Sequence, residues 1–533
     1  MKRSKIGVAI IAFFITFFAV GCSNSSSNSS SNNSSDKYTT YMSQGKDAAS
    51  SQKYEAAEEK FEDAHDVKAT SESKAYADQA GAMKDAQEEI REYEFKDALG
   101  EYFSEYALVK YRVFVEIQWL KFLIENVESN VLSKFDKDNL GQIEAISKDF
   151  NYDSFKAIKD IEAITRHDVK AVEYFIGNQL KDMGYDYLIS FVHIGCTSED
   201  INNTSYACMI KHGLNDVWLK KAKEFTAVIN KWAVEHKNDA MLAHTHGQPA
   251  TPTTIGKEFK VYAYRFTSSI ENIENIKIKA KFNGATGNYS AILTAFPQLD
   301  WQTLNKKFVE EYLGLTYNPL TTQIESHDYT CHILDGIRHF NNVLVDFDVD
   351  MWLYISMEYF KQIPVKGEVG SSTMPHKVNP IRFENSEANV DMSNNICVGL
   401  SNKLPRSRMQ RDLSDSSSQR NIGLAFGYSL QAISETTNGL AKCVVNKDKL
   451  AADLNEKWEV LAEPIQTMLR KYGISDAYDQ LKELTRGKNI SQEAIMKFAK
   501  GLDVLSDEDR QTLLDMTPAS YIGYASNLCD IDL

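Results

Sequence analysis

Prolines are scarce in this chain, with 10 among 533 residues, and long segments beyond residue 40 contain few helix-breaking residues. Apolar residues recur in these segments at the spacing of amphipathic helices, for example over 261–280 and 333–357. The length is sufficient for about two to four domains with a large buried core. We therefore predict an all-α protein built around a long helical bundle.

The charge balance of the chain is acidic, with a formal net charge of −15 at pH 7. A general nucleic-acid-binding protein needs a basic face for phosphates, so we expect no nucleic-acid partner. A local basic pocket for a small phosphorylated ligand is compatible with this balance.

Seven cysteines are scattered along the chain, at Cys22, Cys196, Cys208, Cys331, Cys397, Cys443 and Cys529. None belongs to a CxxC pair or to a Cys/His spacing typical of zinc sites, so we expect no metal. Apart from Cys22, which belongs to the N-terminal segment, we expect buried reduced thiols in preference to disulfides.

Residues 1–22 are typical of a secretory signal. A positively charged start precedes the apolar run 6–20, and residues 19–22 read Ala-Val-Gly-Cys. This ending is similar to the lipobox of bacterial lipoproteins, which makes Cys22 the predicted lipidation site and the only predicted membrane contact. A transmembrane anchor is disfavoured because the apolar run is short for a bilayer.

Residues 23–37 are predicted to be a disordered Ser/Asn-rich linker, because such a composition cannot bury a core. Residues 38–98 are polar but helical in pattern, with a possible turn at 50–52 and a restart of the pattern at 95–98. Four residues after the turn share one helical face: Tyr54, Ala57, Phe61 and Ala64. The segment resembles a tetratricopeptide-like helical hairpin, and a solvated amphipathic spacer explains it equally well.

Four islands rich in Gly, Ser, Thr, His and Asn interrupt the helical pattern of the remaining chain: 165–170, 196–203, 245–252 and 370–385. The first three each have a purely structural explanation, since a histidine can cap a helix and Thr-Ser-Glu-Asp can begin one. The fourth contains Gly-Ser-Ser-Thr-Met-Pro-His-Lys-Val-Asn-Pro, which favours neither helix nor strand. We interpret it as a mobile loop that carries chemistry.

This fourth island resembles the signature loop of the fumarase/aspartase superfamily. The histidine at this position of the loop, His376, resembles the pattern of adenylosuccinate lyases. Fumarases tend to have glycine there and argininosuccinate lyases glutamine. The island 245–252 matches the catalytic-histidine segment of the same enzymes. The likeness covers about residues 99–533, through further segments at 323–328, 408–413, 458–466 and 484–487.

The resemblance implies an all-helical fold in three parts: a small domain over 99–190 with a truncated start, a central bundle over 191–435 and a helical domain over 436–533. It also implies a homotetramer with a shared bundle of twenty helices, in which each active site draws loops from three subunits. No cofactor is implied.

The implied reaction is a β-elimination that releases fumarate from adenylosuccinate, giving AMP, and from SAICAR, giving AICAR, in purine biosynthesis. Such a reaction needs a base for the Cβ proton and an acid for the departing nitrogen. By resemblance Ser371 is the base and His246 the acid, while Lys377 and Asn379 stabilise the carboxylates. The implied substrate-binding residues are His167, Asp168, Thr197, Ser198, Gln323, Ser372, Lys377, Val378, Asn379, Asn385, Arg411, Ser416 and Arg420.

The chain departs from the family pattern at two places. Family members open with Ser-Pro-x-Asp-Gly-Arg-Tyr, whose Arg-Tyr pair touches the substrate phosphate, whereas residues 88–94 read Glu-Glu-Ile-Arg-Glu-Tyr-Glu. We interpret Arg91 there as a coincidence, so we expect the phosphate site to lack one contact, worth about 1.5–3 kcal/mol. Arg166 also stands where asparagine is common, which we expect to weaken that segment.

The N-terminal signal conflicts with this function, because a lipobox exports a protein while the lyase body is expected in the cytoplasm. We interpret the chain as a lipoprotein start fused, or joined by a misassembled reading frame, to a lyase truncated near residue 98. The alternative function is a lipid-anchored helical binding protein with a catalytically impaired lyase body. An argininosuccinate-type substrate is disfavoured by His376 and the segment 411–420.

Overall fold

The computed structural model describes these parts of the chain: 33–50, 54–70, 73–74, 99–363, 374, 376–485 and 491–533. The predicted lipidation site Cys22, the residue Arg91 and the loop residues Ser371 and Ser372 lie outside the described residues. Internal contacts divide the chain into a first unit, Met1–Glu101, and a second unit, Tyr102–Leu533.

The first unit contains a helical hairpin of α2 (Asn33–Ser50) and α3 (Tyr54–Val67), which pack against each other. A small buried cluster joins the two helices: Met42, Ala57, Phe61 and Ala64. The helical face predicted for 57–64 is therefore confirmed as the buried face of α3. Whether the hairpin belongs to a tetratricopeptide repeat stays a prediction, and the restart at 95–98 lies outside the described residues.

The expected linker is shorter than predicted, because α2 begins at Asn33 and residues 33–37 are helical. The Ser/Asn composition therefore does not prevent helix formation where a following helix can pack.

Helix α6 (Glu105–Asn126) organises the region that opens the second unit. Ser104 caps it by accepting from the backbone N–H of Ala107 at 3.0 Å, and most of its apolar residues are buried. The short elements of this region are α5 (Gly100–Phe103), η2 (Leu132–Lys134), η3 (Lys137–Asn139), α7 (Leu140–Lys148), α8 (Tyr152–Thr165), α9 (Asp168–Asp182) and η4 (Asp186–Phe191).

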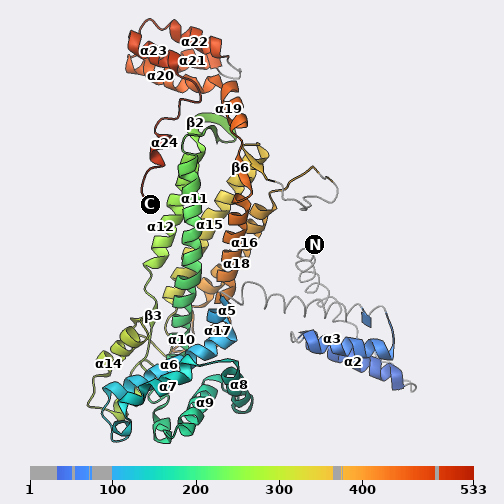
Figure 1. Cartoon of the computed structure of the whole chain (residues 1–533), viewed down its shortest axis with the longest axis vertical. Helices are drawn as coiled ribbons and strands as arrows, with labels where there is room; N and C mark the ends of the chain where they lie inside the picture. The colour runs from blue at the N-terminus through green and yellow to red at the C-terminus, as the bar shows by residue number, and fades with distance from the viewer. Residues whose placement is uncertain are drawn as a thin grey trace. The chain divides into compact units, whose positions relative to one another are not determined.

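A bundle of long helices forms the centre of the second unit (Figure 1). Its members are α10 (Ser198–His212), α11 (Leu219–Glu235), α12 (Ile255–Glu274), α15 (Asp328–Ser356), α16 (Ile381–Lys403) and α18 (Ile422–Leu440). The π-helix η5 (Gly213–Trp218) joins α10 to α11 without interruption. The helix expected over 261–280 ends earlier, at Glu274, and the one expected over 333–357 is part of α15, which ends at Ser356.

Buried polar side chains fix how the bundle helices meet. Trp218 donates to the hydroxyl of Ser429 at 2.9 Å, and Ser429 donates to Asn341 at 2.7 Å. The Asn341 amide donates in turn to Ser393 at 3.0 Å, so one chain of hydrogen bonds links η5, α18, α15 and α16. A fully satisfied buried network of this kind specifies one helix register over others.

Three short two-stranded sheets accompany the helices. Strands β1 (Ala240–Thr245) and β2 (Gln248–Thr254) form an antiparallel hairpin between α11 and α12. The others are β3 (Lys279–Ala280) with β4 (Thr316–Tyr317), parallel, and β5 (Phe360–Gln362) with β6 (Cys443–Val445), antiparallel. Between β3 and β4 lie α13 (Ser290–Ala295), α14 (Trp301–Lys307) and the π-helix η6 (Phe308–Tyr312).

The C-terminal part of the second unit has its own apolar core, which includes Trp458, Ile465, Leu481 and Ile495. Its elements are α19 (Lys447–Glu456), η7 (Trp458–Leu461), α20 (Ala462–Lys471), α21 (Ala477–Thr485), α22 (Gln492–Lys500), α23 (Asp507–Asp515) and α24 (Ala525–Leu528). The segment with α24 returns to the bundle and contacts α12.

The structure confirms the predicted all-α class, since the strands are few and short. The six cysteines within its described residues are free thiols, five of them buried and Cys196 half-buried, as expected. Among the described helices, none is long and apolar enough to cross a membrane.

Candidate active site

Residues of α6, α10 and α17 (Ser414–Gln419) line a cavity of ≈ 680 Å³, and we call this region the pocket end of the bundle. It is lined by eight of the residues that the resemblance implied for substrate binding. They are His167, Asp168, Thr197, Ser198, Gln323, Arg411, Ser416 and Arg420. Four separate stretches of sequence thus contribute to one cavity.

Arg112 of α6 holds the island 165–170 against the pocket. Its guanidinium donates to Asp168 at 2.7 Å and to Asn202 of α10 at 2.8 Å. Burial disfavours ionisation of Asp168, but the Arg112 charge and hydrogen bonds outweigh it and hold the pKa of Asp168 below its usual range. His167 is the N-cap of α9, where its Nδ1 accepts from the backbone N–H of Lys170 at 3.2 Å. The island 165–170 therefore both forms the start of α9 and contributes residues to the pocket lining.

A buried ion pair supports the pocket residues Thr197 and Ser198 at the start of α10. Asp200 accepts from the backbone N–H of Thr197 at 2.9 Å, and its carboxylate lies 2.9 Å from the ammonium of Lys281. The side chains of Lys281 and Asp200 are 0% and 1% exposed. Asp200 also accepts from the backbone N–H of Gly284 at 3.1 Å, so three segments converge on one carboxylate.

Arg411 is held in the pocket by a carboxylate that the sequence had not singled out. Its Nη1 lies 3.0 Å from Oε2 of Glu199 and 3.5 Å from the amide oxygen of Gln323. The side chains of Arg411 and Glu199 are 13% and 3% exposed. Burial raises the pKa of Glu199 to about 7, against the opposing charge of Arg411.

A second buried pair orients the helix α17, which carries Ser416. The imidazole of His327 lies 3.3 Å from Asp415, and both side chains are buried. Asp415 also accepts from the backbone N–H of Ser416 at 2.7 Å. Burial of Asp415 is outweighed by its hydrogen bond to His327, which holds the pKa of Asp415 below its usual value.

Two further arginines bring positive charge to the pocket. Arg166, in the left-handed conformation with φ of 55°, lines it beside Arg420. Within the described residues neither guanidinium makes an ion pair, so both charges are available to an anion. The arginine that replaces the common asparagine at this position thus adds a cation to the pocket.

Several lining residues were not predicted from the sequence: Arg112, Glu199, Asn202, Tyr206 and Gln419. Glu199 and Asn202 stand inside the island 196–203, where they read as ordinary first-turn helix residues. Arg112 is a charge on the buried face of a largely apolar helix, and its 5% exposure marks it as a residue with a specific partner.

The predicted acid His246 lies elsewhere, at the tip of the β1–β2 hairpin. His246 and Gly247 form the turn with φ of 55° and 70°, and the histidine is exposed. The hydroxyl of Thr251 in β2 donates to Glu463 of α20, which holds the hairpin against the C-terminal part.

The described residues of the signature island lie near this hairpin, and we call this region the hairpin end of the bundle. The carbonyl of Val378 accepts from Gln362 of β5 at 2.9 Å, and the ring of the preceding Tyr359 lies 6.1 Å from that of His244 in β1. Lys377, Val378 and Asn385 are exposed, and Asn379 is half-buried.

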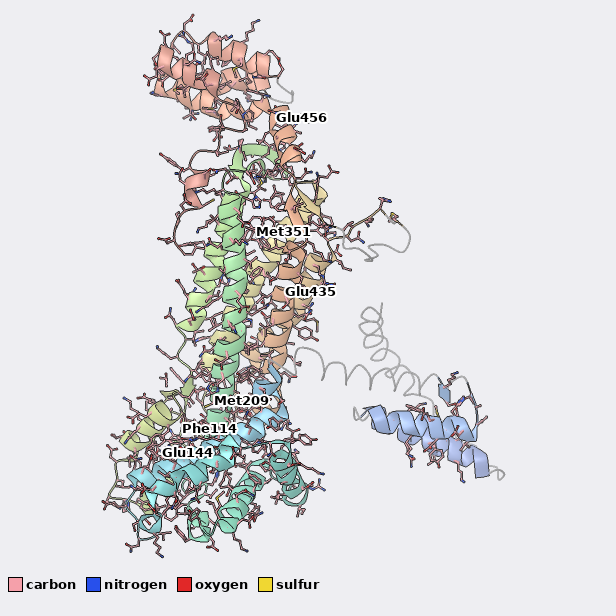
Figure 2. All side chains as sticks on the ribbon, in the orientation of Figure 1. Phe114, Glu144, Met209, Met351, Glu435 and Glu456 are labelled. Carbon is pink, nitrogen blue, oxygen red and sulfur yellow. The ribbon has the colours of Figure 1, made fainter. Side chains whose placement is uncertain are left out.

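The two ends are separated by the length of the bundle, as Figure 1 shows for α17 and β2. α10, η5 and α11, of 15, 6 and 17 residues, run from the pocket to the hairpin, a path of about 57 Å at 1.5 Å per residue. Met209 and Met351, labelled in Figure 2, mark the two halves of this length. One chain therefore brings eight predicted residues together and holds His246, Lys377, Val378, Asn379 and Asn385 apart from them.

The fold resembles solved structures of other enzymes. The 3-carboxy-cis,cis-muconate lactonizing enzyme from Pseudomonas putida has a TM-score of 0.62 at 18% identity, covering 81% of this chain and 95% of that one. Fumarate lyase from Mesorhizobium sp. BNC1 has a TM-score of 0.64 at 17% identity, covering 81% and 96%. These identities show a shared fold alone. A Lyase family model matches residues 91–393, which makes the chain a lyase.

A model described as adenylosuccinate lyase C-terminal matches residues 407–522. Adenylosuccinate lyase of Vibrio cholerae is 48% identical over 434 residues, which are 81% of this chain and 95% of that protein. The enzyme of Escherichia coli strain K12 is 46% identical over the same shares. The chain belongs to the adenylosuccinate lyase family.

Proposed function

We propose that the chain releases fumarate by β-elimination from adenylosuccinate, giving AMP, and from SAICAR, giving AICAR. The observation that carries this proposal is the cavity at the pocket end, which gathers eight implied substrate-binding residues and four arginines. An arginine-rich cavity suits the phosphate that both substrates share. Family membership supplies the reaction class.

In this proposal His246 protonates the departing nitrogen and Ser371 removes the Cβ proton. A serine is a poor base at its ordinary pKa, so its surroundings must activate it when the loop closes over the substrate. Lys377 and Asn379 stabilise the charge that develops on the carboxylate, and Ser372 donates a further hydrogen bond. Val378 and Asn385 complete the contacts at the succinyl side. The reaction needs neither a metal nor an organic cofactor.

At the nucleotide side we propose that Arg411, Ser416 and Arg420 bind the phosphoribosyl group. The remaining lining residues, His167, Asp168, Thr197, Ser198 and Gln323, contact the rest of the substrate. Arg166 lines the same cavity and makes no ion pair with the described residues, so it offsets the contact that the altered opening segment 88–94 was expected to lose.

We further propose a homotetramer in which each active site combines the pocket end of one subunit with the hairpin end of others. The separation of about 57 Å along the bundle supports this, because no substrate of this class spans it. Large apolar side chains exposed on the bundle helices also favour burial against other copies: Tyr264, Trp352, Leu353 and Met392.

For location we propose the cytoplasm for the lyase body, which the free thiols of the described residues support, because such thiols persist in reducing compartments. Acylation of Cys22, a membrane anchor and a fused or misassembled origin of the N-terminus stay predictions. No observation in the described residues favours the alternative of an anchored binding protein with an impaired lyase body.

The test is an assay of the purified chain with adenylosuccinate, with SAICAR and with argininosuccinate as the competing substrate. We expect ultraviolet changes and equimolar fumarate with the first two and no fumarate with the third. Absence of fumarate from both purine substrates would overturn the proposal. Fumarate from argininosuccinate would overturn the substrate assignment.

A further inference from the structure

The buried carboxylate of Glu199 pairs with Arg411, the pocket arginine that we propose binds the ligand's phosphate. Glu199 projects from the first turn of α10, and its Oε2 lies 3.0 Å from Nη1 of Arg411. Its other oxygen, Oε1, is buried and has no hydrogen-bond partner within the described residues. The same holds for Nε of Arg411, so the pair is only partly satisfied.

We propose that Glu199 positions Arg411 in the empty pocket and takes up a proton when the ligand's phosphate enters. This inference deepens the proposed function and rests on it, because it concerns the phosphate of the same nucleotides. Glu199 would then act through Arg411 and not on the reacting bond.

Competition for Arg411 is the physical reason. A phosphate dianion that takes over the guanidinium leaves Glu199 as a buried carboxylate without a cation, which is costly. Protonation removes this cost, and the unpartnered Oε1 is the atom available to carry the proton. The neighbouring carboxylates need no such change, because Asp168 is paired with Arg112 and Asp415 with His327.

The surroundings of Glu199 support an exchangeable proton at neutral pH. The titratable and charged groups that face it from the packed elements are Arg411, His327, Asp415, Lys281, Tyr206 and Tyr329. Burial raises the pKa of Glu199 to about 7 against the charge of Arg411. An arriving phosphate raises this pKa further, so the ligand binds the protonated form more tightly and affinity falls as pH rises above about 7.

The test compares AMP binding to the wild-type chain and to Glu199→Gln by titration calorimetry between pH 6 and 8.5. Glutamine mimics the protonated carboxyl, so the two affinities should agree at pH 6. With a pKa of about 7, linkage predicts binding about 30-fold tighter in Glu199→Gln than in wild type at pH 8.5. The titration of the AMP phosphate cancels in this ratio.

Glu144→Gln is the matched control, because Glu144, labelled in Figure 2, is a half-buried carboxylate of α7 that pairs with Lys121 and Lys148 and does not line the pocket. Its AMP affinity should follow that of the wild type at every pH. A constant affinity ratio between wild type and Glu199→Gln across this range would overturn the inference, because a merely structural role changes affinity without changing its pH dependence.

A second measurement uses the wild type alone and does not depend on the folding of a variant. AMP titrations at pH 7.5 in two buffers of different ionisation enthalpy give the number of protons taken up. We expect about 0.5–0.8 proton per site, because about three quarters of the Glu199 carboxyls are ionised at pH 7.5 before the ligand binds, and zero uptake or release would overturn the inference. Wild-type turnover of adenylosuccinate is measured in parallel, because its absence would overturn the proposed function and this inference together.

Discussion

The pocket end and the hairpin end of the bundle differ in how a single chain holds its functional residues. At the pocket end, ion pairs with little exposure, such as Asp200 with Lys281 and Glu199 with Arg411, fix the lining. At the hairpin end, His246 and Lys377 stand exposed on short connections. The residues proposed to bind the nucleotide are therefore organised within one chain, whereas His246 and Lys377, proposed to act on the succinyl group, are exposed on that same chain.

The difference shows which surfaces must surround the functional side chains at each end. Burying a charge requires partners that the same fold can place, and the pocket end supplies them from α6, from α10, from the residue after β3 and from the segment that leads into α17. Exposed catalytic groups gain a water-excluded, low-dielectric environment only when another surface covers them. A site shared between subunits provides that cover, so assembly and catalysis should depend on each other.

The largest expected effect is at the hairpin end. His246→Ala should lower kcat by about 10²–10⁴-fold, because a positioned general acid contributes this much. Ser371→Ala should have a similar effect. Steady-state fumarate release measures both, and light scattering should show an unchanged oligomer. Normal turnover in either variant would contradict the assigned roles.

Mixing two inactive variants tests whether the halves come from different chains. His246→Ala and Arg420→Ala are unfolded and refolded together, and hybrid oligomers then contain some sites with neither substitution. Activity should recover to many times that of either parent refolded alone. If each chain held a complete site, the mixture would show only the sum of its parents.

At the pocket end the next largest effect concerns stability. Lys281→Met should lower the free energy of unfolding by about 3–5 kcal/mol, because it leaves the Asp200 carboxylate buried without its cation. Urea denaturation measures the change. Lys231→Met is the control, since its pair with Glu235 is exposed and should contribute less than about 1 kcal/mol. Equal losses in both variants would remove the contrast between buried and exposed pairs.

Arg411→Lys should affect binding more than chemistry. Lysine keeps the charge but loses the planar fork, so we expect KM to rise about 10–100-fold, equivalent to about 1.5–3 kcal/mol, with kcat within a few-fold. Initial rates over a range of adenylosuccinate concentrations separate the two constants. A fall in kcat at unchanged KM would place Arg411 in the chemical step.

The sequence allowed eight of the residues that line the pocket to be predicted, but not the interactions that hold them in place. Motif islands carry recognisable residues, so Thr197, Ser198 and Arg411 were found without knowledge of their neighbours. Their supports, Lys281 and Glu199, have partners distant in the chain, and a charged residue in an ordinary polar context gives no local sign of full burial. Long-range pairing of this kind is visible only once the fold brings the segments together.

The fold class followed from helical periodicity, whereas element boundaries did not. The helix expected over 261–280 stops at Glu274, because the following residues turn towards strand β3 and pair with Thr316. Likewise the histidine island reads as a loop in the sequence but forms the β1–β2 hairpin. These strands read Ala-Met-Leu-Ala-His-Thr and Gln-Pro-Ala-Thr-Pro-Thr-Thr, without strict alternation of apolar and polar residues, and the prolines of the second argue against a strand.

The smallest expected effect concerns the anchor of the hairpin. Thr251→Val removes the hydrogen bond to Glu463 and keeps the side-chain volume. Because this contact is exposed, it should contribute no more than about 1 kcal/mol, so kcat should fall by less than about fivefold. Thr437→Val, which removes a hydroxyl of α18 within the bundle, is the comparison for a loss unrelated to the hairpin. A loss of kcat as large as that of His246→Ala would mean that the hairpin depends on its own chain for its position, and the two ends would then be organised in the same way.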